Sequence, residues 1–316
     1  MGKLGVFVDR QTLSSSNQLR SLIRFRDIAE SMGHEFYFLF PNEINKIKTL
    51  DGLFIRCKTD PMNISYVASR MAELHGVKVI DDSKSIRICA DKINMYSHMI
   101  KNGINIPKTI FMKKSEVNEG NAEKIISELG LPLVLKEPST SFSVRVEKIT
   151  SLEEFMKVAN RFTRLSDIFV VQEFIGSKFD WRIGVINGEI IYTCKYHLPK
   201  ESFKIQDCID GHMVFCTVES IPLDEVPKKV LELGLKAANA VGNGLYGIDL
   251  KERNGEVYVI EVNDNPSMET TEDEFYPEAY LKIISYIMNT DKSNFHKNEL
   301  NISEALETNG VVNDRN

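Results

Sequence analysis

Two short apolar segments, Gly247–Lys251 and Val257–Val262, each contain a single acid, Asp249 in the first and Glu261 in the second. The residues between them include the dipeptide Asn254-Gly255, which is typical of a two-residue hairpin turn. Successive side chains of a strand point to opposite faces, so each acid can face away from the apolar side of a half-buried strand. The pattern predicts an antiparallel hairpin that displays two carboxylates.

Asn263 lies two residues after Glu261 and shares its face of the strand. Together with Asp249, these side chains provide three oxygen ligands on one sheet face. Mg²⁺, with Mn²⁺ as an alternative, is usually held by a few such ligands plus substrate phosphates. The competing interpretation is a solvated polar face. The solvent side of the turn already has charged residues of its own: Lys251, Glu252 and Glu256. The sequence therefore favours the metal site.

Charge and composition narrow the class of protein. The 316 residues include 39 Lys and Arg against 45 Asp and Glu, a net charge of −6 that disfavours nucleic acid as a partner. The five cysteines are scattered, with no C-x-x-C pair, as expected for reduced thiols. We find neither a signal peptide nor a run near the roughly 20 apolar residues that span a bilayer. We expect a cytoplasmic protein without a membrane partner.

The order of the elements predicts a mixed α/β (α+β) fold in three lobes. Strands alternate with helices over residues 1–88, which indicates a small parallel α/β lobe. Residues 89–168 read as a leading helix followed by an α+β lobe. Residues 169–290 contain several strands, including a hairpin at Asn187-Gly188, and residues 291–316 form a polar tail.

The hairpin and the segment Ile260–Pro266 (IEVNDNP) resemble the metal-binding end of ATP-grasp enzymes, and in particular RimK-like glutamate ligases. Further family landmarks occur upstream in the expected order: Asp91-Lys92, GINIPKT at 103–109, PLVLK at 132–136, VQEFI at 171–175 and DWR at 180–182. The resemblance covers about residues 85–270, and the order of the landmarks is more specific than any one of them. It implies an ATP-grasp fold, in which an N-terminal parallel α/β lobe accompanies two α+β lobes that clamp ATP.

The resemblance also implies roles for residues that bind the nucleotide. Lys92 and Lys136 resemble the two lysines that contact the phosphates, although Lys92 could instead be a solvated lysine. Asp180 corresponds to a residue near the ribose. Four residues correspond to the hinge whose backbone binds the adenine edge: Gln172, Glu173, Phe174 and Ile175. The alternative interpretation of this segment is an ordinary strand end.

Arg182 and Lys195 resemble basic residues that face the transferred phosphoryl and acyl groups, and we predict that they are catalytic. The planar guanidinium of Arg182 can hold two oxygens at once, but it could instead pair with Asp180. Cys194 is a nucleophile candidate, although a cysteine in an apolar strand more often serves packing.

The chain departs from the family pattern in two places. The loop over the phosphates, residues 137–145, contains no glycine, but its hydroxyls and backbone amides, with Ser141 among them, can still bind phosphate. Residues 197–211 contain no clear copy of an Arg-x-Asn-type segment that follows the central strand in the family. This region is expected to face the substrates, so glutamate as the transferred group does not carry over.

These observations predict an ATP-dependent carboxylate–amine ligase that forms an amide through an acyl phosphate. The expected partners are a small carboxylic acid and an amine, and the acceptor is either an amino acid or a peptide or protein. The resemblance allows for a homo-oligomer, because the family often forms dimers or tetramers. Two alternatives are a small-molecule kinase of the same fold and a nucleotide-binding sensor or scaffold without turnover.

Overall fold

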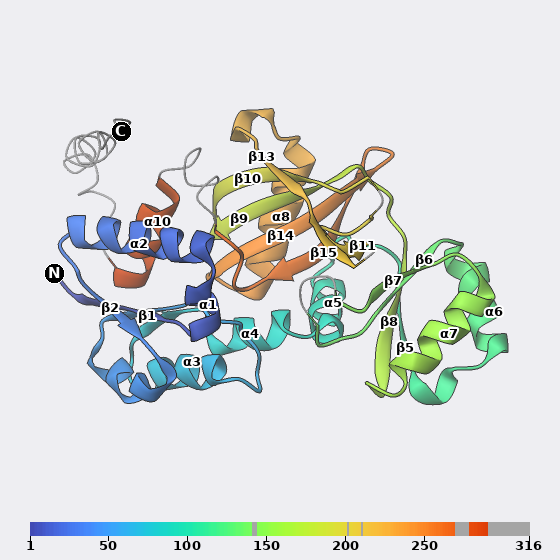
Figure 1. The fold of residues 1–316 in the computed structure, drawn as a ribbon. Helices are drawn as coiled ribbons and strands as arrows, with labels where there is room; N and C mark the ends of the chain where they lie inside the picture. The colour runs from blue at the N-terminus through green and yellow to red at the C-terminus, as the bar shows by residue number, and fades with distance from the viewer. Residues whose placement is uncertain (141–143, 201, 210, 269–277, 290–316) are drawn as a thin grey trace.

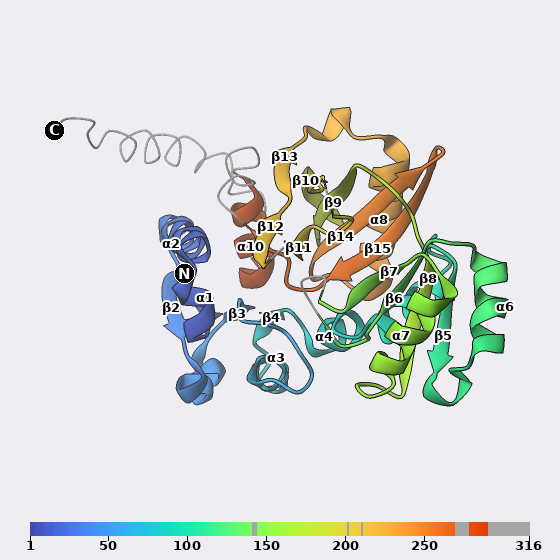
Figure 2. The same cartoon turned by 45° about the vertical axis from the view of Figure 1, so that its right-hand side comes forward.

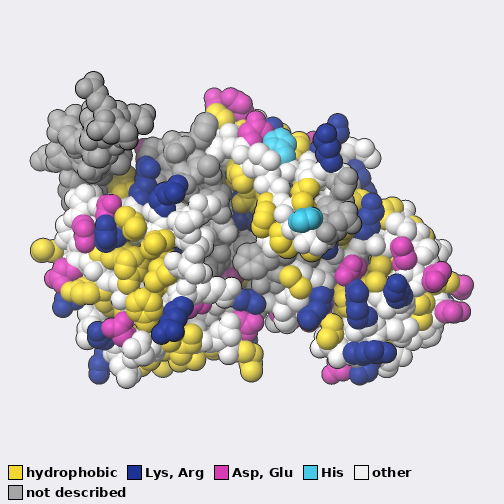
Figure 3. Space-filling model, viewed as in Figure 1, with side chains coloured by type: hydrophobic (Ala, Val, Ile, Leu, Met, Phe, Trp, Pro, Cys, Tyr) yellow, Lys and Arg dark blue, Asp and Glu magenta, His cyan; other side chains and the backbone are white. Residues whose placement is uncertain are grey.

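The computed structural model describes residues 1–140, 144–200, 202–209, 211–268 and 278–289. Its elements form three lobes (Figure 1). The N-terminal lobe and the middle lobe lie at opposite ends of the molecule, and the C-terminal sheet lies between them in both views (Figures 1 and 2). In the same orientation, Figure 3 shows several Lys and Arg side chains on the near face of the middle lobe, although the net charge of the chain is −6.

The N-terminal lobe is built on a fully parallel sheet in the order β2-β1-β3-β4, as the alternation of strands and helices predicts. Its two faces are both apolar. Helix α2 (Ser16–Ser31) packs on one face in a core cluster with Leu4 and Val6, and α3 (Ile64–Leu74) packs on the other in a cluster with Phe7. The remaining elements of the lobe are β1 (Lys3–Phe7), α1 (Arg10–Ser14), β2 (Glu35–Leu39), the 3₁₀ segment η1 (Pro41–Thr49), β3 (Gly52–Ile55) and β4 (Lys78–Ile80).

The leading helix predicted ahead of the middle lobe begins directly after Asp91, which caps it by accepting a hydrogen bond from the Asn94 amide, and a shorter helix precedes it. The middle lobe that follows has an antiparallel sheet in the order β5-β8-β6-β7, covered on one face by α6 and α7. Its elements are α4 (Ser83–Cys89), α5 (Lys92–Lys101), β5 (Thr109–Lys113), η2 (Lys114–Glu116), α6 (Glu119–Leu129), β6 (Leu133–Lys136), β7 (Val146–Ile149), α7 (Leu152–Phe162) and β8 (Ile168–Glu173).

The C-terminal lobe has an antiparallel sheet in the order β13-β10-β9-β14-β15. Both predicted hairpins are present, with Asn187-Gly188 and Asn254-Gly255 at positive φ, the backbone region that a two-residue turn of this type requires. Helix α8 covers one face of the sheet. The elements are β9 (Phe179–Ile186), β10 (Glu189–His197), the ribbon β11 (Gln206–Ile209) with β12 (His212–Phe215), β13 (Thr217–Ser220), η3 (Leu223–Glu225), α8 (Lys228–Val241), β14 (Leu245–Arg253) and β15 (Glu256–Asn263).

Helix α10 (Glu278–Met288) connects the N-terminal lobe with the C-terminal lobe, because it packs against α2, β3 and β4 of the first and against β10 of the second. Each predicted lobe contains one main sheet, although β8 pairs with the middle-lobe strands and lies mostly beyond residue 168; the boundaries at residues 88, 168 and 290 stay predictions. The predicted polar tail lies outside the described residues. No helix in the described part of the chain is long and apolar enough to cross a membrane.

Candidate nucleotide-binding site

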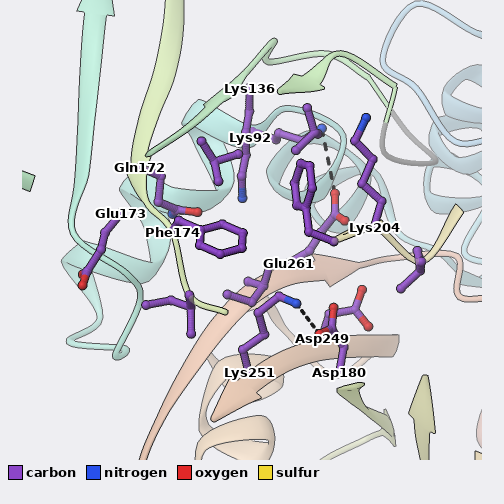
Figure 4. Close-up of a pocket in the computed structure, with 16 residues that line it drawn as sticks. Lys92, Lys136, Gln172, Glu173, Phe174, Asp180, Lys204, Asp249, Lys251 and Glu261 are labelled. Carbon is purple, nitrogen blue, oxygen red and sulfur yellow. Dashed lines mark hydrogen bonds and ion pairs between the residues drawn. The ribbon is translucent and has the colours of Figure 1, made fainter. Parts of the chain in front are cut away.

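A pocket lies between the sheet of the middle lobe and the sheet of the C-terminal lobe (Figure 4). Its walls come from β6, β7 and β8 on one side and from β9, β14 and β15 on the other, with the start of α5 and the segment 203–205 completing it. Most of the residues singled out in the sequence line it: Lys92, Lys136, Gln172, Glu173, Phe174, Ile175, Asp180, Asp249 and Glu261.

Strand register brings the three predicted metal ligands together. Asp249 on β14 pairs directly with Glu261 on β15, and Gly247 pairs with Asn263 two residues along. The side-chain amide Nδ2 of Asn263 lies 3.2 Å from Oδ2 of Asp249. The adjacent apolar residues of β14, such as Ile248, point to the opposite face and pack in the core against α8. The alternation of polar and apolar residues thus concentrates oxygen ligands at the pocket.

Arg182 is fixed beneath this group by a bidentate ion pair with Asp249. Its Nε lies 2.5 Å from Oδ1 and its Nη2 lies 2.8 Å from Oδ2 of the carboxylate, and both residues are buried. Burial opposes the charge of Arg182, but the carboxylate outweighs it and holds the pKa of Arg182 well above its ordinary value. The alternative pairing of Arg182 with Asp180 is therefore wrong, because Asp180 pairs with Lys251.

Gly247 makes room for this arrangement. A Cβ at this position would lie 2.7 Å from the side chain of Pro266 and 3.1 Å from Nη1 of Arg182. Both distances are shorter than ordinary van der Waals contacts, so a larger residue would displace the guanidinium or the turn that follows β15.

Two lysines enter the pocket from the middle-lobe side (Figure 4). Lys92, in the first turn of α5, donates through Nζ to the carbonyl oxygen of Thr140 and lies 3.9 Å from Oε1 of Glu261. Lys136, at the end of β6, donates to the hydroxyl of Tyr96 at 2.6 Å. Burial lowers the pKa of both, and it lowers the pKa of Lys136 to about 8 although Glu261 and Asp180 partly offset the effect. These are ammonium groups with few partners, as expected of groups that await an anion.

The other end of the pocket is apolar and flanked by the hinge segment. Phe174 points into the cavity (Figure 4), and its ring meets that of Phe203 at 5.8 Å. Gln172 is held by a bond from Nε2 to Oγ1 of Thr109. The carboxylate of Glu173 instead turns away from the cavity and pairs with Arg253 at 2.5 Å. Glu173 is thus placed at the hinge with its charge directed away from the cavity.

Lys195 is a predicted site residue that the structure places away from the pocket. Ser141 lies outside the described residues. The prediction that Lys195 faces the same way as Arg182 is wrong, because Lys195 pairs in register with Trp181 and lies on the opposite face of the sheet. There its Nζ stacks 4.9 Å from the centroid of the Trp181 ring and 5.1 Å from that of Phe179. Cys194 is fully buried in a core cluster, in agreement with a packing role.

Replacement of Lys195 by methionine should therefore leave nucleotide binding and turnover within about twofold of the wild-type values. The expected cost is limited to the cation–π contacts, roughly 0.5–1 kcal/mol at a partly exposed position. A titration of MgADP together with a steady-state rate measurement would check this. A tenfold loss of turnover would show that Lys195 is a catalytic residue after all.

Sequence reasoning missed two lysines that line the pocket. The sequence pattern assigns Lys251 to the solvent-side turn, yet it is buried on the pocket face of β14. Its spacing of two residues from Asp249 is the signal that could have identified it. Lys204 comes from the region expected to face the substrates, together with Phe203 and Ile205, and no regular pattern in that region pointed to the nucleotide pocket.

The donor set at the end of the pocket fits a hard divalent cation. Among the described residues, no three or more His, Cys, Asp and Glu side chains form a complete metal cage. Two carboxylates and one amide oxygen would instead leave positions open for phosphate oxygens and water, which is how Mg²⁺ is commonly bound.

Comparison with known proteins agrees with this geometry. A model of the RimK-like ATP-grasp domain matches residues 89–287. The glutamate–LysW ligase ArgX of Sulfolobus acidocaldarius is 28% identical over 228 residues, 70% of this chain and 77% of that protein. A probable alpha-L-glutamate ligase of Vibrio vulnificus is 24% identical over 304 residues, 90% of this chain and 97% of that protein.

The fold is also found in solved structures. D-alanine–D-alanine ligase from Bacillus anthracis superposes with a TM-score of 0.69 at 19% identity, covering 95% of this chain and all of that one. An ATP-grasp RimK domain protein from Sphaerobacter thermophilus superposes with a TM-score of 0.66 at 15% identity, covering 90% of this chain and 99% of that one. The ordered landmarks, the three lobes and the match over residues 89–287 have one explanation: the chain belongs to the RimK-like ATP-grasp family.

Proposed function

We propose that this ATP-dependent carboxylate–amine ligase activates a small carboxylic acid as an acyl phosphate and transfers the acyl group to the amine of an amino acid or peptide. The observation that supports this most directly is the pocket itself. Two buried lysines face two carboxylates across a cavity whose other end is apolar, an arrangement suited to a nucleoside triphosphate with a bound cation.

The pocket gives each part of ATP a matching surface. The adenine would lie against Phe174 and Phe203 at the hinge, where backbone groups can bind its edge. The phosphates would extend toward Lys92 and Lys136, whose ammonium groups offset the polyanion. Charge and shape therefore set a single direction for the nucleotide, with its terminal phosphate near Glu261.

Asp249, Glu261 and Asn263 would hold Mg²⁺. The ion would supply charge neutralisation between phosphate oxygens. The ion pair with Arg182 fixes the orientation of the Asp249 carboxylate, so the ligand geometry is set before the nucleotide arrives. We assign Arg182 to this positioning role on the basis of its bidentate contact.

The reaction requires two balanced steps. A carboxylate oxygen of the acid attacks the γ-phosphorus, the bond from that phosphorus to the β–γ bridging oxygen breaks, and ADP leaves. The amine then attacks the acyl carbon, loses a proton and displaces inorganic phosphate, which leaves an amide. Lys136 and Lys92 stabilise the negative charge on the phosphoryl oxygens during the first step.

The test is ADP release from MgATP by the full-length protein, screened over pools of carboxylic acids combined with amino acids and short peptides. Glutamate is the first probe, because relatives are named as ligases of glutamate. ADP that appears only with one acid and one amine, together with a new amide detected by mass spectrometry, would establish the reaction.

Two other outcomes would overturn the proposal. A stable phosphorylated product without an amide would identify a kinase. Tight MgADP binding without ADP release from any pool, including peptide and protein acceptors, would identify a nucleotide sensor.

A further inference from the structure

Arg56 connects the N-terminal lobe to the turn that follows β15. It is the first residue after β3, and only 8% of its surface is exposed. Its Nη1 donates to Oδ1 of Asn265 and to the carbonyl oxygen of Pro266, the latter at 3.0 Å. Nδ2 of Asn265 in turn donates to the carbonyl oxygen of Cys57 at 2.8 Å. Three hydrogen bonds thus tie this turn to the end of β3, although 209 positions separate Arg56 from Asn265.

The turn begins directly after one of the proposed cation ligands. Asn263 is the last residue of β15, and its Nδ2 donates to the carbonyl oxygen of Gly247 and to Oδ2 of Asp249, each at 3.2 Å. Because both N–H groups of the amide are engaged in this way, Oδ1 is the side-chain atom that can bind a cation. The amide has to keep this orientation, since a flipped amide would present N–H groups to the ion.

Pro266 carries the contact with Arg56 to the second ligand. Its side chain packs directly over Gly247, where a Cβ would lie 2.7 Å from Pro266 and 3.1 Å from Nη1 of Arg182. Arg182 in turn holds the carboxylate of Asp249 in a bidentate ion pair. A shift of the turn would therefore disturb the guanidinium through Pro266 and the preceding Asn263 through the backbone. In a closely packed interior, such a shift is transmitted rather than absorbed.

We propose that Arg56 is a positioning residue, through which the N-terminal lobe holds the turn at residues 264–266 and keeps Asn263 and Asp249 in the geometry that binds the cation. The inference rests on the proposed function, because it assumes that the hairpin of β14 and β15 binds Mg²⁺ together with a nucleotide. It goes further in giving the N-terminal lobe a part in metal binding, although no described residue before Lys92 lines the nucleotide pocket.

The test separates cation binding from nucleotide binding. The full-length protein is titrated with ADP by calorimetry, once with saturating Mg²⁺ and once with a chelator, which needs neither the acid nor the amine. For the wild type, we expect Mg²⁺ to strengthen ADP binding roughly 50-fold, within the range of coupling between two bound ligands. In Arg56→Met, we expect a gain of only about fivefold, because losing a group that orients metal ligands commonly weakens metal binding tenfold or more. The affinity for metal-free ADP should stay within about twofold of the wild-type value.

A second variant keeps the test decisive if Arg56→Met fails to fold. That failure is conceivable because the charge of Arg56 partly offsets the burial of Asp81, whose pKa is raised well above its ordinary value by burial and by Asp264. Asn265→Ala breaks the same contact but leaves the guanidinium in place, and it should show the same reduced gain. The double variant should lose no more than the weaker of the two single variants, because both changes remove one shared contact.

Two matched variants test the chemistry of the contact. Arg56→Lys keeps the charge and a donor, so the gain from Mg²⁺ should recover to within about threefold of the wild-type value. Arg70→Met is the control in the same lobe, because Arg70 pairs with Glu73 on the surface of α3 and should leave the gain unchanged. Thermal melting of each variant checks the fold.

The outcomes separate this inference from the proposed function. If Mg²⁺ strengthens ADP binding as much in Arg56→Met and Asn265→Ala as in the wild type, the role of Arg56 is refuted while the metal site stands. If the variants lose affinity equally with and without Mg²⁺, Arg56 supports the fold in general, and the positioning role is refuted as well. If Mg²⁺ does not strengthen ADP binding in the wild type, the metal site of the proposed function fails and this inference fails with it.

Discussion

Glu261→Gln should reduce ATP-dependent turnover by roughly 1,000-fold, which corresponds to about 4 kcal/mol of activation free energy. Glutamine keeps the size and shape of the side chain but removes the charge that would bind the cation. Glu261 is partly exposed to the pocket and pairs directly with Asp249 across the two strands. Among the described residues, no other carboxylate pairs with Asp249 in the sheet, so none is placed to take over the role of Glu261. The measurement is the steady-state rate of ADP release at saturating ATP and substrates.

A matched control distinguishes the metal role from a general effect on the strand. Glu256 lies at the other end of β15, is exposed, and accepts a hydrogen bond from the hydroxyl of Tyr258. Glu256→Gln should retain wild-type turnover. Raising the Mg²⁺ concentration should recover part of the activity of Glu261→Gln, because weaker binding is compensated by mass action. Full activity of Glu261→Gln at ordinary Mg²⁺ concentration would refute the metal assignment.

The metal hairpin shows why some of the site could be predicted from the sequence. A two-residue turn at Asn254-Gly255 fixes a register that would put Glu261 on the face opposite to Asp249. The register shifts by one residue at Ile260, and this bulge brings the two acids onto the same face. In the sequence, the bulge corresponds to the two consecutive apolar residues Val259-Ile260. The pattern of apolar residues around each acid predicts that Asp249 and Glu261 share one face of the sheet, whereas the turn alone would predict opposite faces.

The same effect explains the error at Lys195. The turn at Asn187-Gly188 places Ile186 opposite Glu189, and an uninterrupted ladder would put Lys195 on the face of Asp180. A register shift between Ile190 and Tyr192 moves Cys194 opposite Arg182, which sends Lys195 to the other face. A family resemblance matches positions along the chain, but a bulge of one residue decides which of them reach the pocket.

The residues contributed by the segment before β11 could not be predicted by such patterns. Phe203, Lys204 and Ile205 belong to no regular element, so neither strand nor helix periodicity indicates where their side chains point. Their position depends on tertiary contacts, such as the edge-to-face contact of Phe203 with Phe174. The large elements of the fold follow from local patterns, whereas this wall of the pocket follows from packing between distant segments.

Lys136→Met should abolish measurable MgADP and MgATP binding while making the protein more stable. Lys136 is 6% exposed and has the Tyr96 hydroxyl as its hydrogen-bond acceptor. That hydroxyl also donates to the carbonyl oxygen of Ile260 at 2.6 Å, so it keeps a partner when the lysine is removed. Methionine fills a similar volume without a charge to desolvate. The lysine is thus retained at a cost to stability, as expected of a group that binds an anion.

The pH dependence of the gain follows from the shifted pKa. Burial lowers the pKa of Lys136 from 10.5 to about 8, which corresponds to a penalty on the order of 3 kcal/mol for the charged form. Between pH 8 and 10.5 the unfolded chain binds the proton and the folded chain does not, so the free energy of unfolding of the wild type rises with pH there. The advantage of Lys136→Met is therefore full below pH 8 and disappears above about pH 10.5.

Thermal unfolding at pH 7 and at pH 10 would measure this difference, with an expected rise in Tm of several degrees at pH 7 and a smaller one at pH 10. Lys113→Met, at an exposed position of the same sheet, is the control and should change neither Tm nor nucleotide binding. A variant at Lys136 that is destabilised at pH 7 would show that the ammonium supports the fold. A variant that still binds MgADP with wild-type affinity would show that the phosphates do not reach Lys136. Loss of binding together with a gain in stability is the combination that only a buried, ligand-directed lysine explains.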